Sequence, residues 1–133
     1  ILIALAIASA SLATLSSCTK EYITNALPGV SYVYTIKSNQ WVQTEPKAYR
    51  FEQNVADLDQ RYFEDGHVSV AISYDNNQTT YALLPATIGN YIFTANYSIG
   101  KVRIYAEYRG AGSPIPPDNM ITKIVLTDNE IGN

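Results

Sequence analysis

Apolar and polar side chains alternate with a period of two along most of the chain, and this restricts the fold more than any other feature. Between Ser31 and Lys37, the apolar residues Tyr32, Tyr34 and Ile36 recur at every second position. The same alternation recurs in three further stretches, residues 67–74, 90–98 and 101–109. Successive side chains of a strand point to opposite faces, so this period predicts strands with one apolar face.

Shorter apolar runs complete the set of expected strands, at residues 40–43, 48–53, 79–84 and 120–127. Two longer connections separate them: Asn54 to Gly66, which fits one helical turn or a loop, and Gly110 to Asp118, which is rich in Gly and Pro. No stretch has the apolar stripe of an amphipathic helix. We therefore expect an all-β domain, an antiparallel β-sandwich or barrel-like fold of about seven or eight strands.

An uncharged apolar segment from Ile1 to Leu15 precedes this pattern. Spanning a bilayer takes about 20 apolar residues, so the segment fits a signal peptide better than a transmembrane helix. It ends in Leu15-Ser16-Ser17-Cys18, which resembles the lipobox of bacterial lipoproteins. We expect cleavage between Ser17 and Cys18 and attachment of lipid to Cys18, which would then tether the protein to a membrane.

Cys18 is the only cysteine, so no intramolecular disulfide is expected. The alternative is an ordinary signal peptide or a buried N-terminal helix with an incidental thiol. Because the sequence begins at Ile1, without Met or a basic segment, we expect the precursor to start a few residues earlier. The expected organisation is a signal peptide at 1–17, a lipidated tether at 18–29 and a β-sandwich domain at 30–133.

Several of these features together resemble a family of small, uncharacterised cell-envelope lipoproteins of the Bacteroidota with a single β domain. The features are the lipobox, the strand Val68–Tyr74, the return Tyr81-Ala82-Leu83-Leu84-Pro85 and the closing run Ile121–Leu126. Some members also carry collagen-like Gly repeats, which this chain lacks. The charged stretch Thr19-Lys20-Glu21 resembles signals that route such lipoproteins to the outer membrane. The resemblance implies a fold and an envelope location, with either leaflet open, and no activity.

Composition narrows the classes of partner. The net charge is −3 with 16% charged residues, which argues against nucleic acid as a partner. Tyrosine stands out, with 11 copies against 3 Phe and 1 Trp. Tyrosine suits half-buried strand faces, and it is equally a residue of recognition surfaces.

The sequence shows no catalytic or metal-binding constellation. His67 is the only histidine, no Gly-x-Ser-x-Gly elbow is present, and zinc needs more ligands than one His and one lipidated Cys. The acidic group Asp57, Asp59, Glu64 and Asp65 lacks the spacing of a calcium loop, so solvated carboxylates are favoured over calcium binding. We expect no catalytic residue, no metal and no cofactor beyond the covalent lipid.

Trp41 is the one candidate binding residue, as a stacking platform for a sugar or an anchor for a protein together with the tyrosines. The alternative is that these aromatic side chains fill the core. The leading hypothesis is a non-enzymatic binding or assembly module of the cell envelope, with a glycan or protein partner. An envelope hydrolase with unrecognised catalytic residues and a purely structural subunit are the alternatives. Residues 54–66 and 110–118 are the connections expected to face a partner.

Overall fold

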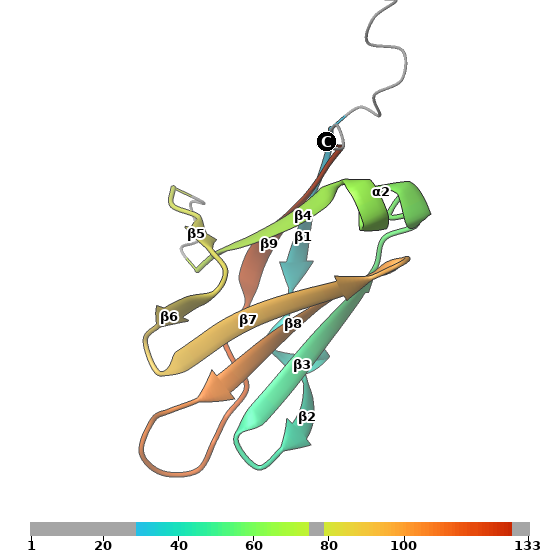
Figure 1. Cartoon of the computed structure of the whole chain (residues 1–133). Helices are drawn as coiled ribbons and strands as arrows, with labels where there is room; N and C mark the ends of the chain where they lie inside the picture. Colours follow the sequence, from blue (N-terminus) through green and yellow to red (C-terminus); the bar gives the residue numbers. More distant parts are fainter. Residues whose placement is uncertain (1–28, 75–78, 129–133) are drawn as a thin grey trace, which may run out of the picture.

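The computed structural model describes residues 29–74 and 79–128, which form two antiparallel sheets packed face to face (Figure 1). The first, sheet A, has the order β1-β9-β4-β5, with β1 at Val30–Ile36, β4 at His67–Ser73, β5 at Ala82–Leu83 and β9 at Met120–Thr127. The second, sheet B, has the order β2-β3-β8-β7-β6, with β2 at Val42–Glu45, β3 at Ala48–Asn54, β6 at Ala86–Ile88, β7 at Tyr91–Ser98 and β8 at Lys101–Tyr108. The prediction of an all-β antiparallel sandwich is confirmed, and the two sheets remain separate rather than closing into a barrel.

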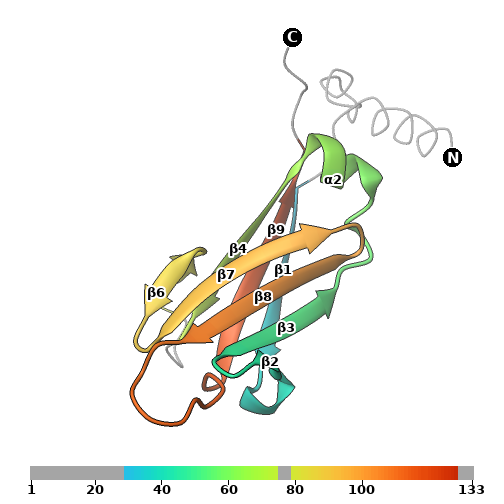
Figure 2. The same ribbon diagram turned by 60° about the horizontal axis from the view of Figure 1, so that its bottom comes forward.

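Two short helical segments accompany the strands: the 3₁₀ helix η2 at Ser38–Gln40 and the α-helix α2 at Gln60–Asp65. The carboxylate of Asp59 caps α2 by accepting the backbone N–H of Tyr62 at 3.1 Å. Figure 2 shows α2 at one end of the sandwich, where the chain crosses from sheet B to the start of β4. The expected helical turn between residues 54 and 66 is therefore present. No helix of the described residues has the length and apolar character needed to cross a membrane.

The core lies between the two sheets and is built from the alternating apolar positions of their strands. Its fully buried members come from both sheets, and include Ile36, Phe93, Ile104, Ile124 and Leu126. The hydrophobic effect favours this burial, and the period of two in the sequence follows from it. The predicted inward faces of the strands at 31–37, 67–74, 90–98 and 101–109 are confirmed.

The structure differs from the predicted strands at the return after β4. A full hairpin partner was expected over residues 79–84, but β5 has only two residues, and an unpredicted strand, β6, follows it. Pro85 lacks an N–H and cannot extend the pairing. The chain instead crosses from sheet A to sheet B at Leu84-Pro85. Both sheets therefore end in a very short strand on the same side of the sandwich.

The segment around Trp41 also differs from the prediction. A strand was expected at residues 40–43, but β2 begins at Val42 and continues to Glu45. The residues before it form η2, in which the side chain of Gln40 accepts the backbone N–H of Lys37 at 2.7 Å. This local bond competes with strand pairing and delays the start of the strand.

Candidate functional site

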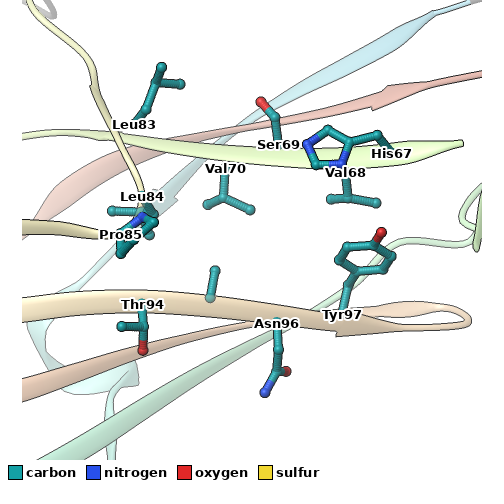
Figure 3. Close-up of a pocket in the computed structure, with 11 residues that line it drawn as sticks. His67, Val68, Ser69, Val70, Leu83, Leu84, Pro85, Thr94, Asn96 and Tyr97 are labelled. Atoms are coloured by element: carbon teal, nitrogen blue, oxygen red, sulfur yellow. The ribbon is translucent and has the colours of Figure 1, made fainter.

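A groove opens on one side of the sandwich, between an edge of β4 and an edge of β7 (Figure 3). Residues 67–70 of β4 form one lip and residues 94–97 of β7 form the other, with Leu83, Leu84 and Pro85 between them. We call this feature the β4–β7 groove. Its volume is about 750 Å³, which lies within the range of about 300–1,000 Å³ that is typical of ligand sites.

The groove exists because the outermost strands are short. In sheet A, β5 pairs with β4 only at Ala71 and Ile72, with one further backbone bond from the N–H of Leu84 to the Val70 carbonyl at 2.9 Å. In sheet B, β6 pairs with β7 no further than Phe93. Over the rest of these two edges, no strand of the described residues covers the backbone.

Ala95 leaves the space between the sheets unfilled. It occupies an inward-facing position of β7, in the row that also contains Tyr91, Phe93 and Tyr97, yet it is exposed. Packed sheets lie about 10 Å apart, and a methyl group cannot fill that separation where its neighbours carry aromatic rings. An inward-facing residue that is open to solvent marks the middle of the groove.

Both ends of the groove are bounded. Leu84 and Pro85, where the chain crosses between the sheets, lie at one end, and Tyr97 lies at the other (Figure 3). The ring of Tyr97 meets Phe63 of α2 edge to face, with centroids 6.0 Å apart and planes at 83°. The groove is therefore a short trough whose long side faces solvent.

The lining of the groove is apolar and carries no formal charge. Val68 and Val70 point across it toward β7, whereas Ser69 points away. On the other lip, Thr94 and Asn96 also point away from sheet A (Figure 3). No Asp, Glu, Lys or Arg is among the described residues that line the groove. Polar recognition inside it would therefore depend on backbone groups rather than on charged side chains.

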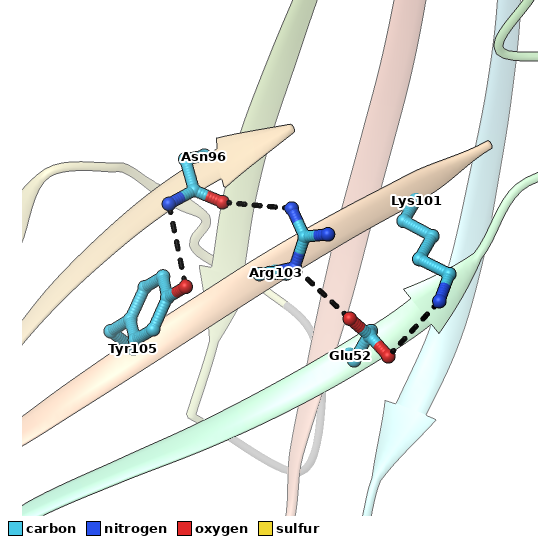
Figure 4. A network of polar contacts seen from close by, with 5 residues as sticks. All are labelled: Glu52, Asn96, Lys101, Arg103 and Tyr105. Atoms are coloured by element: carbon cyan, nitrogen blue, oxygen red, sulfur yellow. Dashed lines mark hydrogen bonds and ion pairs between the residues drawn. The ribbon is translucent and has the colours of Figure 1, made fainter. Parts of the chain in front are cut away.

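A polar network on the outer face of sheet B links β7 to the strands behind it (Figure 4). The guanidinium of Arg103 donates to Glu52 at 3.0 Å and to Asn96 at 3.4 Å, and Lys101 lies 3.7 Å from the same Glu52 carboxylate. Desolvation opposes ionisation of Glu52, but Lys101 and Arg103 outweigh it and lower the pKa of the carboxyl. The network therefore connects β3 and β8 to Asn96 on the β7 lip.

A second hollow, of about 380 Å³, lies between Tyr74, Tyr91, Tyr108 and the loop that follows β8. The hydroxyl of Tyr91 donates to the Ile115 carbonyl at 2.7 Å, and that of Tyr108 donates to the Ala111 carbonyl at 3.1 Å. Burial raises the pKa of Tyr74. The hydroxyl groups of Tyr91 and Tyr108 therefore hold the Pro-rich loop against the end of the sandwich, which is a structural role.

Trp41 lies in the core, with only 7% of its surface exposed. Its ring packs against Phe51 and Phe93 at centroid distances of 6.1 and 6.3 Å. The indole offers no open face to a ligand, and its buried N–H has no hydrogen-bond partner among the residues that the structure describes. Trp41, the candidate binding residue, does not line the β4–β7 groove, because its ring lies between the two sheets.

His67 is exposed at one end of the groove, on the lip formed by β4. Three of the four acidic residues near it in sequence accept local hydrogen bonds. Asp57 accepts a hydrogen bond from the hydroxyl of Tyr32, Asp59 caps α2, and Glu64 accepts the side chain of Gln60 at 2.8 Å. Within residues 29–74 and 79–128, no group of three or more His, Cys, Asp and Glu residues is placed to hold a metal ion.

The predicted lipidation residue, Cys18, and the residue before the cleavage site, Ser17, lie outside the described residues. The predicted signal peptide at 1–17 lies there too, together with nearly all of the tether. The groove itself was not foreseen. The one available signal was Ala95, the only small residue in the otherwise aromatic row of β7.

Comparisons with protein-family models, with curated proteins and with solved structures gave no match to this chain. A function is therefore inferred from the geometry of the groove and from the predicted lipobox at residues 15–18.

Proposed function

We propose that this protein is a lipid-anchored binding module of the bacterial cell envelope, which holds a partner in the β4–β7 groove and catalyses no reaction. Cys18 carries the lipid in this proposal, and the outer membrane is the expected location because of the charged residues that follow it. The sandwich presents the groove as a rigid surface, as is usual for recognition sites on β scaffolds.

One observation carries the proposal: the inward-facing Ala95 is open to solvent in the middle of an otherwise well-filled sandwich. Closing the gap would have needed only a larger side chain at this position or two longer edge strands. Val68 and Val70, which are themselves almost completely buried, form the apolar floor of this space. Burying apolar surface contributes about 25 cal/mol per Å², so the exposed apolar surface around Ala95 is a favourable contact for a partner.

The lining of the groove does not support the alternative of a hydrolase. No carboxylate of the described residues lines it, and the hydroxyl of Ser69 points away from its interior (Figure 3). General acid–base chemistry needs titratable groups within hydrogen-bond reach of the substrate, and the titratable side chains among the described lining residues are His67 and Tyr97.

Photo-crosslinking in the native host tests the binding role. A photoreactive amino acid at Leu83, which is 69% exposed at the end of the groove where the chain crosses between the sheets, is expected to give adducts with an envelope component. The matched position is Val42, which is 55% exposed on β2, at the far edge of sheet B. Adducts from Leu83 are expected to disappear when Ala95→Leu is added. Equal adducts from both positions, or adducts from Leu83 that survive Ala95→Leu, would contradict the proposal.

The anchor has its own test. Metabolic labelling with an alkyne fatty acid is expected to mark the protein, and Cys18→Ser is expected to abolish the label because no other thiol is present. Persistent labelling of Cys18→Ser would remove the lipoprotein assignment and leave the groove proposal unaffected.

A further inference from the structure

Along the groove, the backbone of β7 has hydrogen-bonding groups that no strand of residues 29–74 and 79–128 pairs with. Its pairing with β8 fixes which residues these are, because the N–H of Arg109 donates to the Asn90 carbonyl at 2.6 Å. In an antiparallel ladder, the N–H and C=O of one residue point to the same side and alternate residues point to opposite sides. Even-numbered residues of β7 therefore bond to β8, and Ala95 and Tyr97 direct their N–H and C=O groups outward.

Among the strands that the structure describes, none pairs with these outward groups. Pairing with β6 ends at Phe93, and β6 is the last strand of sheet B within the described residues. An edge strand with free N–H and C=O groups is a template for another strand. The β4 lip has fewer free backbone groups, because the carbonyl of Val70 already accepts the N–H of Leu84. Val68 is the residue of this lip whose N–H and C=O still face outward.

We infer that the occupant of the β4–β7 groove is an extended polypeptide segment of a partner protein, which adds to sheet B along the free edge of β7 and continues the position of β6. This inference rests on the proposed function and names the chemistry of the ligand. Main-chain bonds to Ala95 and Tyr97 supply the affinity, as in other cases of strand addition. Alternate side chains of the segment point inward over Ala95 and onto Val68 and Val70.

The residues that line the groove determine which side chains and which length of peptide segment fit it. The part of the chain that the structure describes gives the groove no Asp, Glu, Lys or Arg side chain, so an inward-pointing charge would be buried without a charged partner there. Ala95 leaves room opposite it for a larger apolar residue, whereas Tyr97 and Leu84 limit the length at the two ends. A glycan fits less well, because the polar side chains of Ser69, Thr94 and Asn96 point away from the interior. The preferred segment is therefore short, uncharged on its inward face and apolar at every second residue.

A peptide pool provides the probe. Capped peptides of about seven residues alternate Thr with Ala, Val, Leu, Phe or Tyr, and are titrated into ¹⁵N-labelled protein to about 1 mM. Members that bind are expected to slow hydrogen exchange at Ala95 and Tyr97 by at least about tenfold, the effect of one net hydrogen bond. N-methylation of one alternate set of peptide amides is expected to abolish binding, whereas methylation of the other set is not.

Two variants of the protein test the main-chain hydrogen bonds between β7 and the peptide. Ala95→Pro removes an outward N–H that β8 does not use, and proline is tolerated at strand edges. It is expected to weaken peptide binding by about tenfold or more, whereas the matched Ala95→Ser, which keeps the N–H, is expected to bind normally. If Ala95→Pro does not fold, the N-methylated peptides test the main-chain bonds without a change in the protein.

The outcomes separate this inference from the proposed function. Binding that is equal for both methylated sets, or that leaves exchange at Ala95 and Tyr97 unchanged, would overturn strand addition while keeping the groove as a binding site. The same holds if no peptide binds while Leu83 still gives crosslinks that Ala95→Leu removes. Failure of both the peptides and the crosslinks would overturn the proposed function as well.

Discussion

The two long sides of the sandwich are closed to different degrees. On the side of β1 and β3, the rings of Tyr32 and Tyr34 stack at 6.0 Å between centroids, and the chain after β3 buries Val55 and Leu58 almost completely. On the side of β4 and β7, the corresponding space is left open at Ala95. The same alternating pattern produces both sides, so a single small residue and the length of the edge strands decide whether a side is sealed or accessible.

Leu58→Ala should give the largest loss of stability on the closed side. Leu58 is fully buried, and removing a buried leucine side chain costs about 2–5 kcal/mol. Chemical denaturation followed by fluorescence of the single Trp41 measures the change. A loss below about 1 kcal/mol would show that the side of β1 and β3 is not sealed as described.

Ala95→Leu is the matched change on the open side, and we expect it to alter the free energy of unfolding by less than about 1 kcal/mol. The added side chain enters space that is already accessible, so it should meet little steric resistance. Thr87→Leu, on the outer face of β6, is the control for a gain of apolar surface outside the groove. A cost of about 3 kcal/mol, as overpacking would give, would mean that the groove is closed in solution.

Tyr32 should make the closed side sensitive to alkaline pH. Its hydrogen bond to Asp57, with burial and the charge of Asp57, raises the pKa of the hydroxyl from 10.0 to about 12. The unfolded chain therefore loses this proton first, so the stabilising effect is complete below pH 10 and is lost as the pH rises toward 12. Tyr32→Phe should be less stable at neutral pH and should show a flatter stability profile between pH 10 and 12. Identical profiles for the two proteins would contradict the interaction.

Glu52→Gln should have the smallest effect on stability, because the carboxylate is exposed and its ion pairs are screened by solvent. We expect no resolvable change in a thermal unfolding curve at physiological salt. The effect should appear instead in β7, as faster hydrogen exchange of the Asn96 amide once Arg103 loses its charged partner. Unchanged exchange at Asn96 would show that the network does not hold the β7 lip.

Much of the fold could be predicted from the sequence because burial of one strand face imposes a period of two. The rows that contain Tyr32, Val70, Phe93 and Ile104 all face the core as expected. The edge strands could not be predicted, because their length depends on where the chain changes sheets. The run before Pro85 is as apolar as a full hairpin strand, and only the crossing to sheet B limits β5 to two residues.

The candidate site was predicted less well, and for the same reason. A groove between two edges depends on strand pairing across the whole sandwich, which local patterns do not encode. Trp41, the single tryptophan, was the predicted binding residue. The hydrophobic effect places a large aromatic ring in the core unless other contacts hold it outside, and Trp41 lies in the core. Nothing in the composition singles out Ala95. Its position in the groove follows from its aromatic neighbours in β7 and from the end of the β6 pairing at Phe93.

Residue-resolved hydrogen exchange of the free protein tests the open edge of β7 most directly. The amides of Thr94 and Asn96 bond to β8 and should exchange slowly, whereas those of Ala95 and Tyr97 face the groove and should exchange much faster. This alternation of slow and fast amides is the predicted result. Uniformly slow exchange from Thr94 to Tyr97 would mean that another segment already covers the edge, and it would contradict the account.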